Sequence, residues 1–157
     1  MSFLVLKYLH VIGAAVLLGT GAGIAFFMLL AHFTGDARVV AGVARIVVIA
    51  DFVFTATAVV AQPVTGMMLV GEMGYSMGED WIAASFGLYF VTGAFWLPVV
   101  WMQMKMRDLA RVAAAQGTPL PPAYHRLFWW WFALGFPAFA AVLTIFWLII
   151  ARPVWGS

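Results

Sequence analysis

The sequence predicts an all-α integral membrane protein whose four spans form an antiparallel four-helix bundle. Three observations predict this class: 66% of the 157 residues are hydrophobic, 9% are charged, and the mean hydropathy is +1.04. Soluble domains carry about 25% charged residues, so the composition excludes a water-soluble fold. Because each span needs roughly 20 residues or more, four spans use most of the chain. We therefore expect a single transmembrane domain over residues 1–157.

Apolar runs mark the four expected spans, at about 3–31, 40–71, 81–106 and 126–151. The links between them are short, and short links place consecutive spans side by side and antiparallel. The first link contains the turn sequence Thr34-Gly35-Asp36, and the third contains Gly117 to Pro122, a segment that ends helices.

Basic residues predict the orientation in the membrane. Six of the eight Lys and Arg residues lie at the first and third links or in the adjoining turns, whereas Lys7 and Arg152 lie at the other end. Positive residues favour the cytoplasmic side, so both termini are expected outside the cytoplasm. The lipid bilayer is the expected surrounding, and nothing in the sequence predicts a nucleic-acid partner. The six cytoplasmic residues are Arg38, Arg45, Lys105, Arg107, Arg111 and Arg126.

His10 lies inside the first apolar run, where an ionisable group costs free energy unless a partner, a metal or water compensates. A neutral imidazole offers one lone pair, so His10 is a candidate axial ligand to haem b or a candidate proton carrier. A structural histidine that hydrogen-bonds a neighbouring span is the alternative. Lys7, one turn away, could neutralise a haem propionate or extend to the lipid headgroups. The chain has no cysteine, which excludes disulfides, thiolate catalysis and thiolate-ligated haem.

The segment Gln62-Pro63-Val64-Thr65-Gly66 lies at a depth similar to that of His10. Pro63 frees the carbonyl four residues earlier and kinks a helix. The kink could widen a cavity beside His10, or it could serve packing alone. Met67 and Met68 follow at once, and a thioether from either could be a second axial ligand to iron. Chance placement is the alternative for both.

Polar residues recur at helical spacing in every span. Polar faces in lipid turn inward, so we expect all four stripes to surround one bundle axis. Asp51 could make an interhelical hydrogen bond or belong to a proton relay, and the sequence leaves both open. The stripes are His10, Ala14, Leu17 and Gly21; Asp51, Thr55, Ala58, Gln62 and Thr65; Ser85, Tyr89, Thr92, Trp96 and Gln103; and Trp130, Pro137 and Thr144.

Two further features belong to the first and last spans. His32 and His125 lie at the expected cytoplasmic end, where they could ligate a second haem or another metal, or simply be solvated. Gly19 to Gly23 contains a GxxxG pattern, which lets helices approach closely within one chain or in a homo-oligomer.

Five motifs are spread along the chain: Lys7-Tyr8-Leu9-His10-Val11-Ile12-Gly13, Gly19-Thr20-Gly21, Ala61-Gln62-Pro63-Val64-Thr65-Gly66, Trp96-Leu97-Pro98-Val99-Val100-Trp101 and Trp131-Phe132-Ala133-Leu134-Gly135-Phe136-Pro137. Together they resemble a bacterial inner-membrane family known as domain of unknown function 2269. The resemblance spans essentially the whole chain and implies a multi-pass fold in the bacterial inner membrane, but no activity. In that membrane the basic residues place both termini in the periplasm.

A more distant likeness is to HemJ-type protoporphyrinogen oxidases and, less clearly, to CopD-type membrane proteins. Lys7-Tyr8-Leu9-His10 through His32, and Tyr124-His125-Arg126-Leu127-Phe128 through Pro137, are similar to the two ends of HemJ. The likeness implies that His10 ligates haem b. The third span lacks the lysine and histidine of the HemJ pattern, and Leu134-Gly135 replaces its Asn-Glu. Protoporphyrinogen oxidase activity is therefore not expected.

These observations predict a haem b-binding inner-membrane protein in electron transfer or a small redox reaction, with a redox partner or a homo-oligomer as the expected assembly. A haem-dependent oxidoreductase is one form that this function could take. The alternative is a cofactor-free membrane subunit, an assembly partner or a small transporter. The expected cofactor-binding residues are His10, Lys7, Ala14, Gln62, Thr65, Tyr89 and Trp96.

Overall fold

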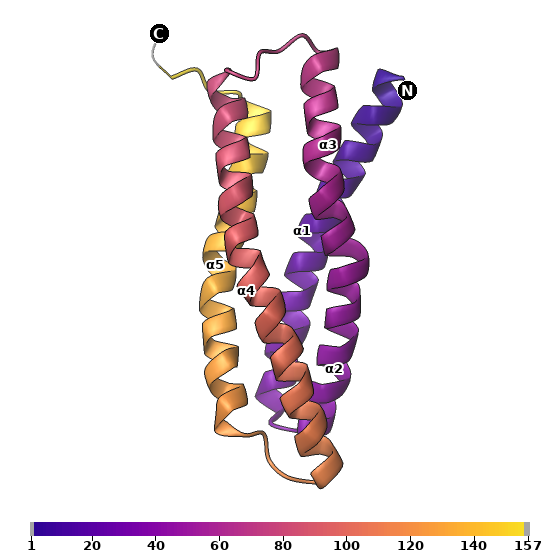
Figure 1. Ribbon diagram of the computed structural model, residues 1–157, viewed down its shortest axis with the longest axis vertical. Helices are drawn as coiled ribbons and strands as arrows, with labels where there is room; N and C mark the ends of the chain where they lie inside the picture. Colours follow the sequence, from indigo (N-terminus) through magenta and orange to yellow (C-terminus); the bar gives the residue numbers. More distant parts are fainter. Residues whose placement is uncertain (1, 156–157) are drawn as a thin grey trace.

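Four long helical segments, each apolar enough to cross a membrane, make up the computed structural model, which describes residues 2–155. Consecutive segments run antiparallel, so the N- and C-termini lie at the same end of the bundle (Figure 1). The predicted class, an antiparallel four-helix membrane bundle, is confirmed. The elements are α1 (Phe3–Thr34), α2 (Ala37–Ala50), a π-helical turn (Asp51–Thr55), α3 (Ala56–Glu72), α4 (Asp80–Gln116) and α5 (Pro122–Ala151).

The second span is continuous but not uniform. α2 passes through the π-helical turn into α3 without a break, and the amide of Ala56 donates to the carbonyl of Asp51, five residues earlier. Such π-turns add one residue to a helical turn and are frequent at functional sites. Here the wide turn begins at the buried Asp51.

Local chemistry explains where the helices end. Gly35 follows α1 at φ 66° and Gly117 follows α4 at φ 64°, backbone conformations that a glycine adopts at no steric cost. The Asp36 carboxylate caps α2 by accepting from the backbone amide of Arg38 at 2.7 Å. Pro122 starts α5, where its missing N–H costs nothing.

α4 is longer than the predicted span. The third link was expected from residue 107, but the helix continues to Gln116 and leaves a link of residues 117–121. Residues 107–116 include four alanines and two arginines, which are strong helix formers whether or not lipid surrounds them. Hydropathy located the end of the apolar run, whereas Gly117 determines the end of the helix.

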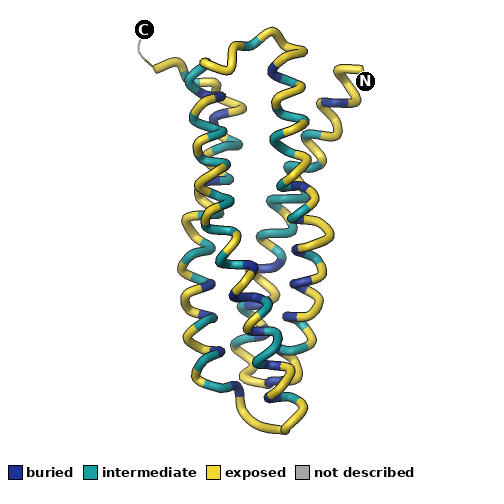
Figure 2. The backbone as a smooth tube through the Cα atoms, viewed as in Figure 1, coloured by how far each residue is buried: buried dark blue, intermediate teal, exposed yellow. Residues whose placement is uncertain are grey.

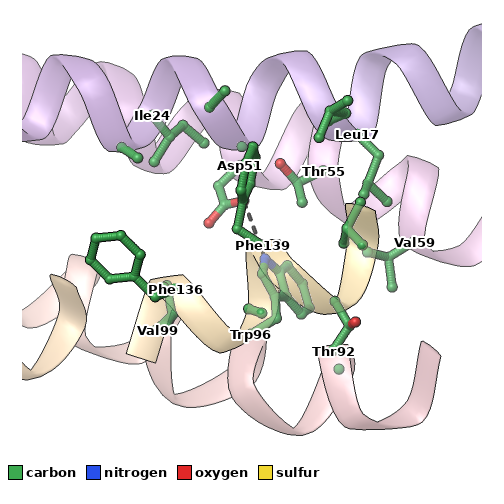
Figure 3. Close-up of a pocket in the computed structure, with 18 of the residues that line it drawn as sticks. Leu17, Ile24, Asp51, Thr55, Val59, Thr92, Trp96, Val99, Phe136 and Phe139 are labelled. Carbon is green, nitrogen blue, oxygen red and sulfur yellow. Dashed lines mark hydrogen bonds between the residues drawn. The ribbon is translucent and has the colours of Figure 1, made fainter. Parts of the chain in front are cut away.

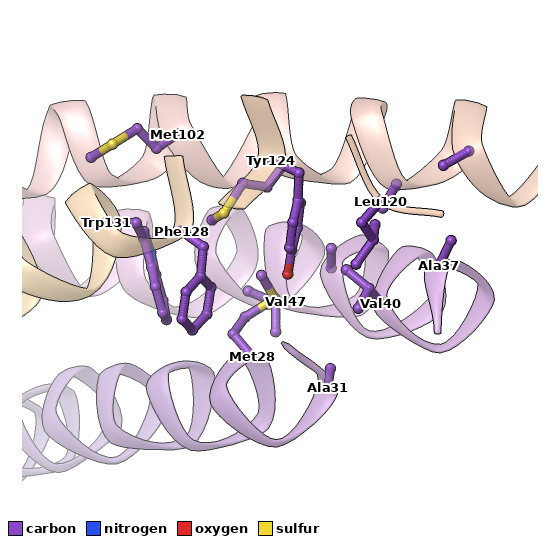
Figure 4. Packing of buried hydrophobic residues seen from close by; sticks show 14 of the residues in the cluster. Met28, Ala31, Ala37, Val40, Val47, Met102, Leu120, Tyr124, Phe128 and Trp131 are labelled. Carbon is purple, nitrogen blue, oxygen red and sulfur yellow. The ribbon is translucent and has the colours of Figure 1, made fainter. Parts of the chain in front are cut away.

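The two ends of the bundle pack differently. We call the end that holds both termini the terminal end, and the end that holds the α1–α2 and α4–α5 links the link end. At the link end α2 packs on α4, and a dense cluster joins all four spans (Figures 2 and 4). Towards the terminal end the pair α1–α3 and the pair α4–α5 lie further apart (Figure 1), and a smaller cluster of Val70, Trp81, Ile82 and Leu148 joins α3, α4 and α5. Fully buried members of the cluster include Met28, Val40, Met106, Ala110, Tyr124 and Phe128.

Two predicted helix faces differ from the structure. On α5, Trp130, Pro137 and Thr144 are exposed, and the inward stripe instead contains Trp131, Gly135, Ala138 and Val142. The predicted stripe was therefore wrong, because aromatic bulk rather than polarity faces the axis on this helix. On α1, Gly19 would meet no neighbouring atom if it carried a Cβ. The GxxxG pattern thus makes no close helix contact within the described residues, and a contact between copies stays a prediction.

Candidate functional site

His10 lines a cavity of about 180 Å³ at the terminal end, which we call the terminal cavity. α1 and α3 form one side of it, and α4 and the end of α5 form the other. The walls are mostly apolar, with a few polar side chains. The residues that line it include His10, Gln62, Met73, Trp81, Tyr89 and Arg152.

The His10 ring is held by a short hydrogen-bond chain. Its Nδ1 lies 2.7 Å from the Thr65 hydroxyl, and that hydroxyl lies 2.8 Å from the carbonyl of Ala61. The hydroxyl has a single proton, and in the tautomer in which that proton goes to Ala61, His10 donates from Nδ1. In this tautomer the lone pair of the neutral ring is on Nε2, which makes no hydrogen bond within residues 2–155. A histidine that ligates a metal is typically held this way through its other nitrogen.

Glycines let α1 and α3 approach closely beside the ring. The Gln62 side chain donates to the His10 carbonyl at 3.0 Å, and a Cβ on Gly13 would collide with its amide nitrogen. A Cβ on Gly66 would lie 3.3 Å from His10 Cε1. Larger residues at 13 or 66 would push the helices apart or displace the ring. The sequence showed these glycines but not what they face.

Tyr89 has a structural role that the sequence did not reveal. Its hydroxyl donates to the carbonyl of Val59, which is the carbonyl four residues before Pro63. Pro63 has no N–H to give to that carbonyl. A tyrosine on α4 therefore satisfies the acceptor that the proline leaves on α3, as lipid requires. The same contact joins α3 to α4.

The cation at the terminal cavity is Arg152, not Lys7. The Arg152 guanidinium lies 5.3 Å from the ring centre of Tyr75 and 5.6 Å from that of Trp81, and it donates to the Tyr75 hydroxyl. Lys7 is exposed, lies 6.0 Å from the Phe3 ring and does not line the cavity. Lys7 was expected from its sequence distance to His10, whereas Arg152 arrives from the far end of the chain.

Neither Met67 nor Met68 lines the terminal cavity. Both are nearly half exposed, at 47% and 46%, because their helical positions turn them away from the face that carries Thr65 and Gly66. A second axial ligand would have to lie beside His10, and the structure places neither methionine there. Met73, one residue beyond α3, lines the cavity instead. No signal in the sequence distinguished it from the other methionines.

A second cavity, of about 340 Å³, lies deeper in the bundle, and we call it the central cavity (Figure 3). Gln62 and Tyr89 line both cavities, whereas Ala14 and Trp96 line only the central one. Asp51, 3% exposed, accepts from Trp96 Nε1 at 3.4 Å across the bundle. The predicted inward stripes of the first three spans therefore do meet around one axis.

His32 and His125 lie together at the link end, far from His10 along α1. Their ring centres are 5.6 Å apart, and His32 stacks on Phe128 at 3.5 Å with nearly parallel planes. The Nδ1 atom of His32 is buried and has no hydrogen-bond partner in the described chain. Across residues 2–155, no three His, Asp or Glu side chains gather closely enough to hold a metal ion. A metal or haem between these two histidines stays a prediction.

Comparison with known proteins identifies the family but no activity. The sequence model of a family described as predicted integral membrane protein (DUF2269) matches residues 4–153. The chain belongs to the DUF2269 family. Searches of curated proteins and of solved structures gave no match. For this DUF2269 protein, the similarity to HemJ and CopD remains an expectation, and the features that bear on function are the two cavities.

Proposed function

We propose that this DUF2269 protein binds haem b through His10 in the bacterial inner membrane and takes part in electron transfer or a small redox reaction. The observation that carries the proposal is that Nδ1 of the His10 ring is hydrogen-bonded to Thr65, whereas Nε2 has no partner among the described residues, beside a largely apolar cavity. With the proton on Nδ1, Nε2 would offer its lone pair to iron. Haem iron is commonly held by one such histidine.

The surrounding residues fit a flat apolar group with acidic edges. Val70, Phe86 and Ile149 give apolar walls, and Gly66 leaves room next to the imidazole. Arg152 supplies a fixed positive charge at the cavity and would pair with a carboxylate on the ligand. The terminal and central cavities share Gln62, Tyr89 and Ile145, so the two cavities adjoin at these residues.

Bound haem would supply a one-electron redox change at iron, and the chain's own residues would set its conditions. Thr65 would fix the tautomer and the orientation of the His10 ring. Met73 lines the same cavity and would be the thioether available to hold the group. The apolar walls would exclude water from the ligated face.

An absorption spectrum tests the proposal. Protein made with ample haem precursor and purified in mild detergent should show a Soret band that shifts on reduction with dithionite. His10→Ala should lose the haem or shift the band, because it removes the one imidazole among the described residues that line the terminal cavity.

The matched control is His125→Ala, which changes an exposed histidine at the other end of the bundle. Its spectrum should equal that of the wild type. A colourless wild-type protein from haem-replete cells would refute the proposal, and an unchanged spectrum in His10→Ala would place the ligand elsewhere.

A further inference from the structure

The hydrogen bonds around Asp51 make it an acceptor at both carboxylate oxygens. Trp131 directs its indole N–H at the Gln103 side chain, so the Gln103 oxygen faces Trp131, at 3.1 Å. The Gln103 amide nitrogen then faces Asp51 and donates to Oδ2 at 2.7 Å. Trp96 donates to Oδ1. Two donors on α4 therefore hold Asp51, and both would stabilise the carboxylate once it is ionised.

No cation in the described chain balances this charge. The structure shows one ion pair within residues 2–155, between Arg107 and Asp108, and no basic side chain lies within ion-pair distance of Asp51. The Thr55 hydroxyl lies next to the Asp51 carboxylate, at the end of the same π-helical turn. It is buried and meets the criteria for no hydrogen bond among the described residues. Thr55 is 6% exposed and lines the same cavity (Figure 3). An ionised Asp51 without a counter-charge would be costly in the apolar bundle, so a positive ligand is what would stabilise the ionised form.

Aromatic rings line the α4 and α5 side of the central cavity. Rings from α4 and α5 surround the space next to Asp51, and aromatic faces attract cations, most strongly where water is excluded. The cavity also reaches the outer surface of the bundle, because Phe136 and Phe139 at its wall are 62% and 40% exposed. A ligand could therefore come from the lipid. The rings are those of Trp96, Trp131, Phe132, Phe136, Phe139 and Phe146.

We propose that the central cavity is a binding site for a lipophilic organic cation. The positive charge would face the Asp51 carboxylate, with the Thr55 hydroxyl beside it, and the apolar body would lie against the rings of α4 and α5. This inference does not rest on haem binding. Asp51 is eleven residues from Gln62, which hydrogen-bonds His10, so the two sites are separated by about 16 Å along the helix.

Tetraphenylphosphonium, a lipophilic aromatic cation, tests the proposal on the purified full-length protein in detergent. Its binding, measured by calorimetry or tryptophan fluorescence, should weaken at least tenfold in Asp51→Asn, which keeps the shape and removes the charge. Asp51→Glu should retain binding within a few-fold. Asp108→Asn, a carboxylate variant at the ion pair with Arg107, should bind as the wild type does.

The neutral analogue triphenylphosphine oxide tests the charge without any mutation. Binding at least tenfold weaker than that of tetraphenylphosphonium is expected. Equal binding of the two compounds, or unchanged binding of the cation by Asp51→Asn, would overturn the proposal. His10→Ala should leave cation binding unchanged, so a failure of this site and a failure of haem binding are distinguishable.

Discussion

At the scale of single residues, several polar groups inside the spans have a hydrogen-bond partner on another helix. The Tyr89 hydroxyl donates to the Val59 carbonyl, and the Gln62 amide donates to the His10 carbonyl. The Trp96 indole donates to the Asp51 carboxylate. Lipid offers no hydrogen bonds, so each such group must find its partner inside the protein. The sequence predicted that these residues face inward, but it did not reveal which partner each one has.

Tyr89→Phe tests the match between α4 and the proline kink. Removing the hydroxyl leaves the Val59 carbonyl unsatisfied, so the free energy of unfolding should fall by about 1–3 kcal/mol. In a Pro63→Ala background the helix supplies its own N–H to that carbonyl, and the cost of Tyr89→Phe should largely disappear. Detergent-induced unfolding, followed by tryptophan fluorescence, measures both.

Tyr8→Phe is the control for that cycle, since Tyr8 is exposed on α1, and it should change the unfolding free energy little. An equal cost of Tyr89→Phe with and without the proline would show that the hydroxyl does not serve the kink.

At the scale of elements, α5 is held mainly at the link end. Phe128 is fully buried there and lies in the cluster that joins all four spans (Figure 4). The terminal part of α5 instead lines both cavities. The predicted stripe on this helix was wrong by one position because its inward residues are aromatic or small, which periodicity of polar residues cannot detect.

Phe128→Ala should destabilise the bundle by about 3–5 kcal/mol, because a buried ring leaves a cavity that its neighbours cannot fill. Phe90→Ala, on a lipid-facing position of α4 that is 71% exposed, should change stability by less than about 0.5 kcal/mol. Thermal unfolding in detergent compares the two. Similar losses for both variants would mean that the link-end cluster does not hold α5.

At the scale of the whole molecule, a packed link end supports a looser terminal end. The C-terminal segment adds a tie there, because the Trp155 amide donates to the Asp80 carboxylate at 2.9 Å. The two cavities lie between the α1–α3 pair and the α4–α5 pair, where the looser packing leaves space. The basic residues predict that the terminal end faces away from the cytoplasm.

Single cysteines test that orientation cleanly, since the natural chain has none. Ser76→Cys lies in the α3–α4 link at the terminal end, and Thr118→Cys lies in the α4–α5 link at the link end. If the basic residues set the orientation, a membrane-impermeant maleimide should label only Ser76→Cys in cells whose outer membrane is permeabilised. After the inner membrane is opened, both should react. Labelling of Thr118→Cys alone in the closed state would invert the predicted topology.

The sequence by itself determined the membrane class, the four spans and the inward faces of the first three. Hydropathy and helical period are local properties, so they are readable without a fold. Only the tertiary structure decided which side chains meet: Arg152 rather than Lys7 at the terminal cavity, Tyr89 at the carbonyl freed by Pro63, and Gln103 at Asp51. These pairs join different spans, and their meeting depends on helix rotation and depth, which interhelical packing fixes and no single span encodes.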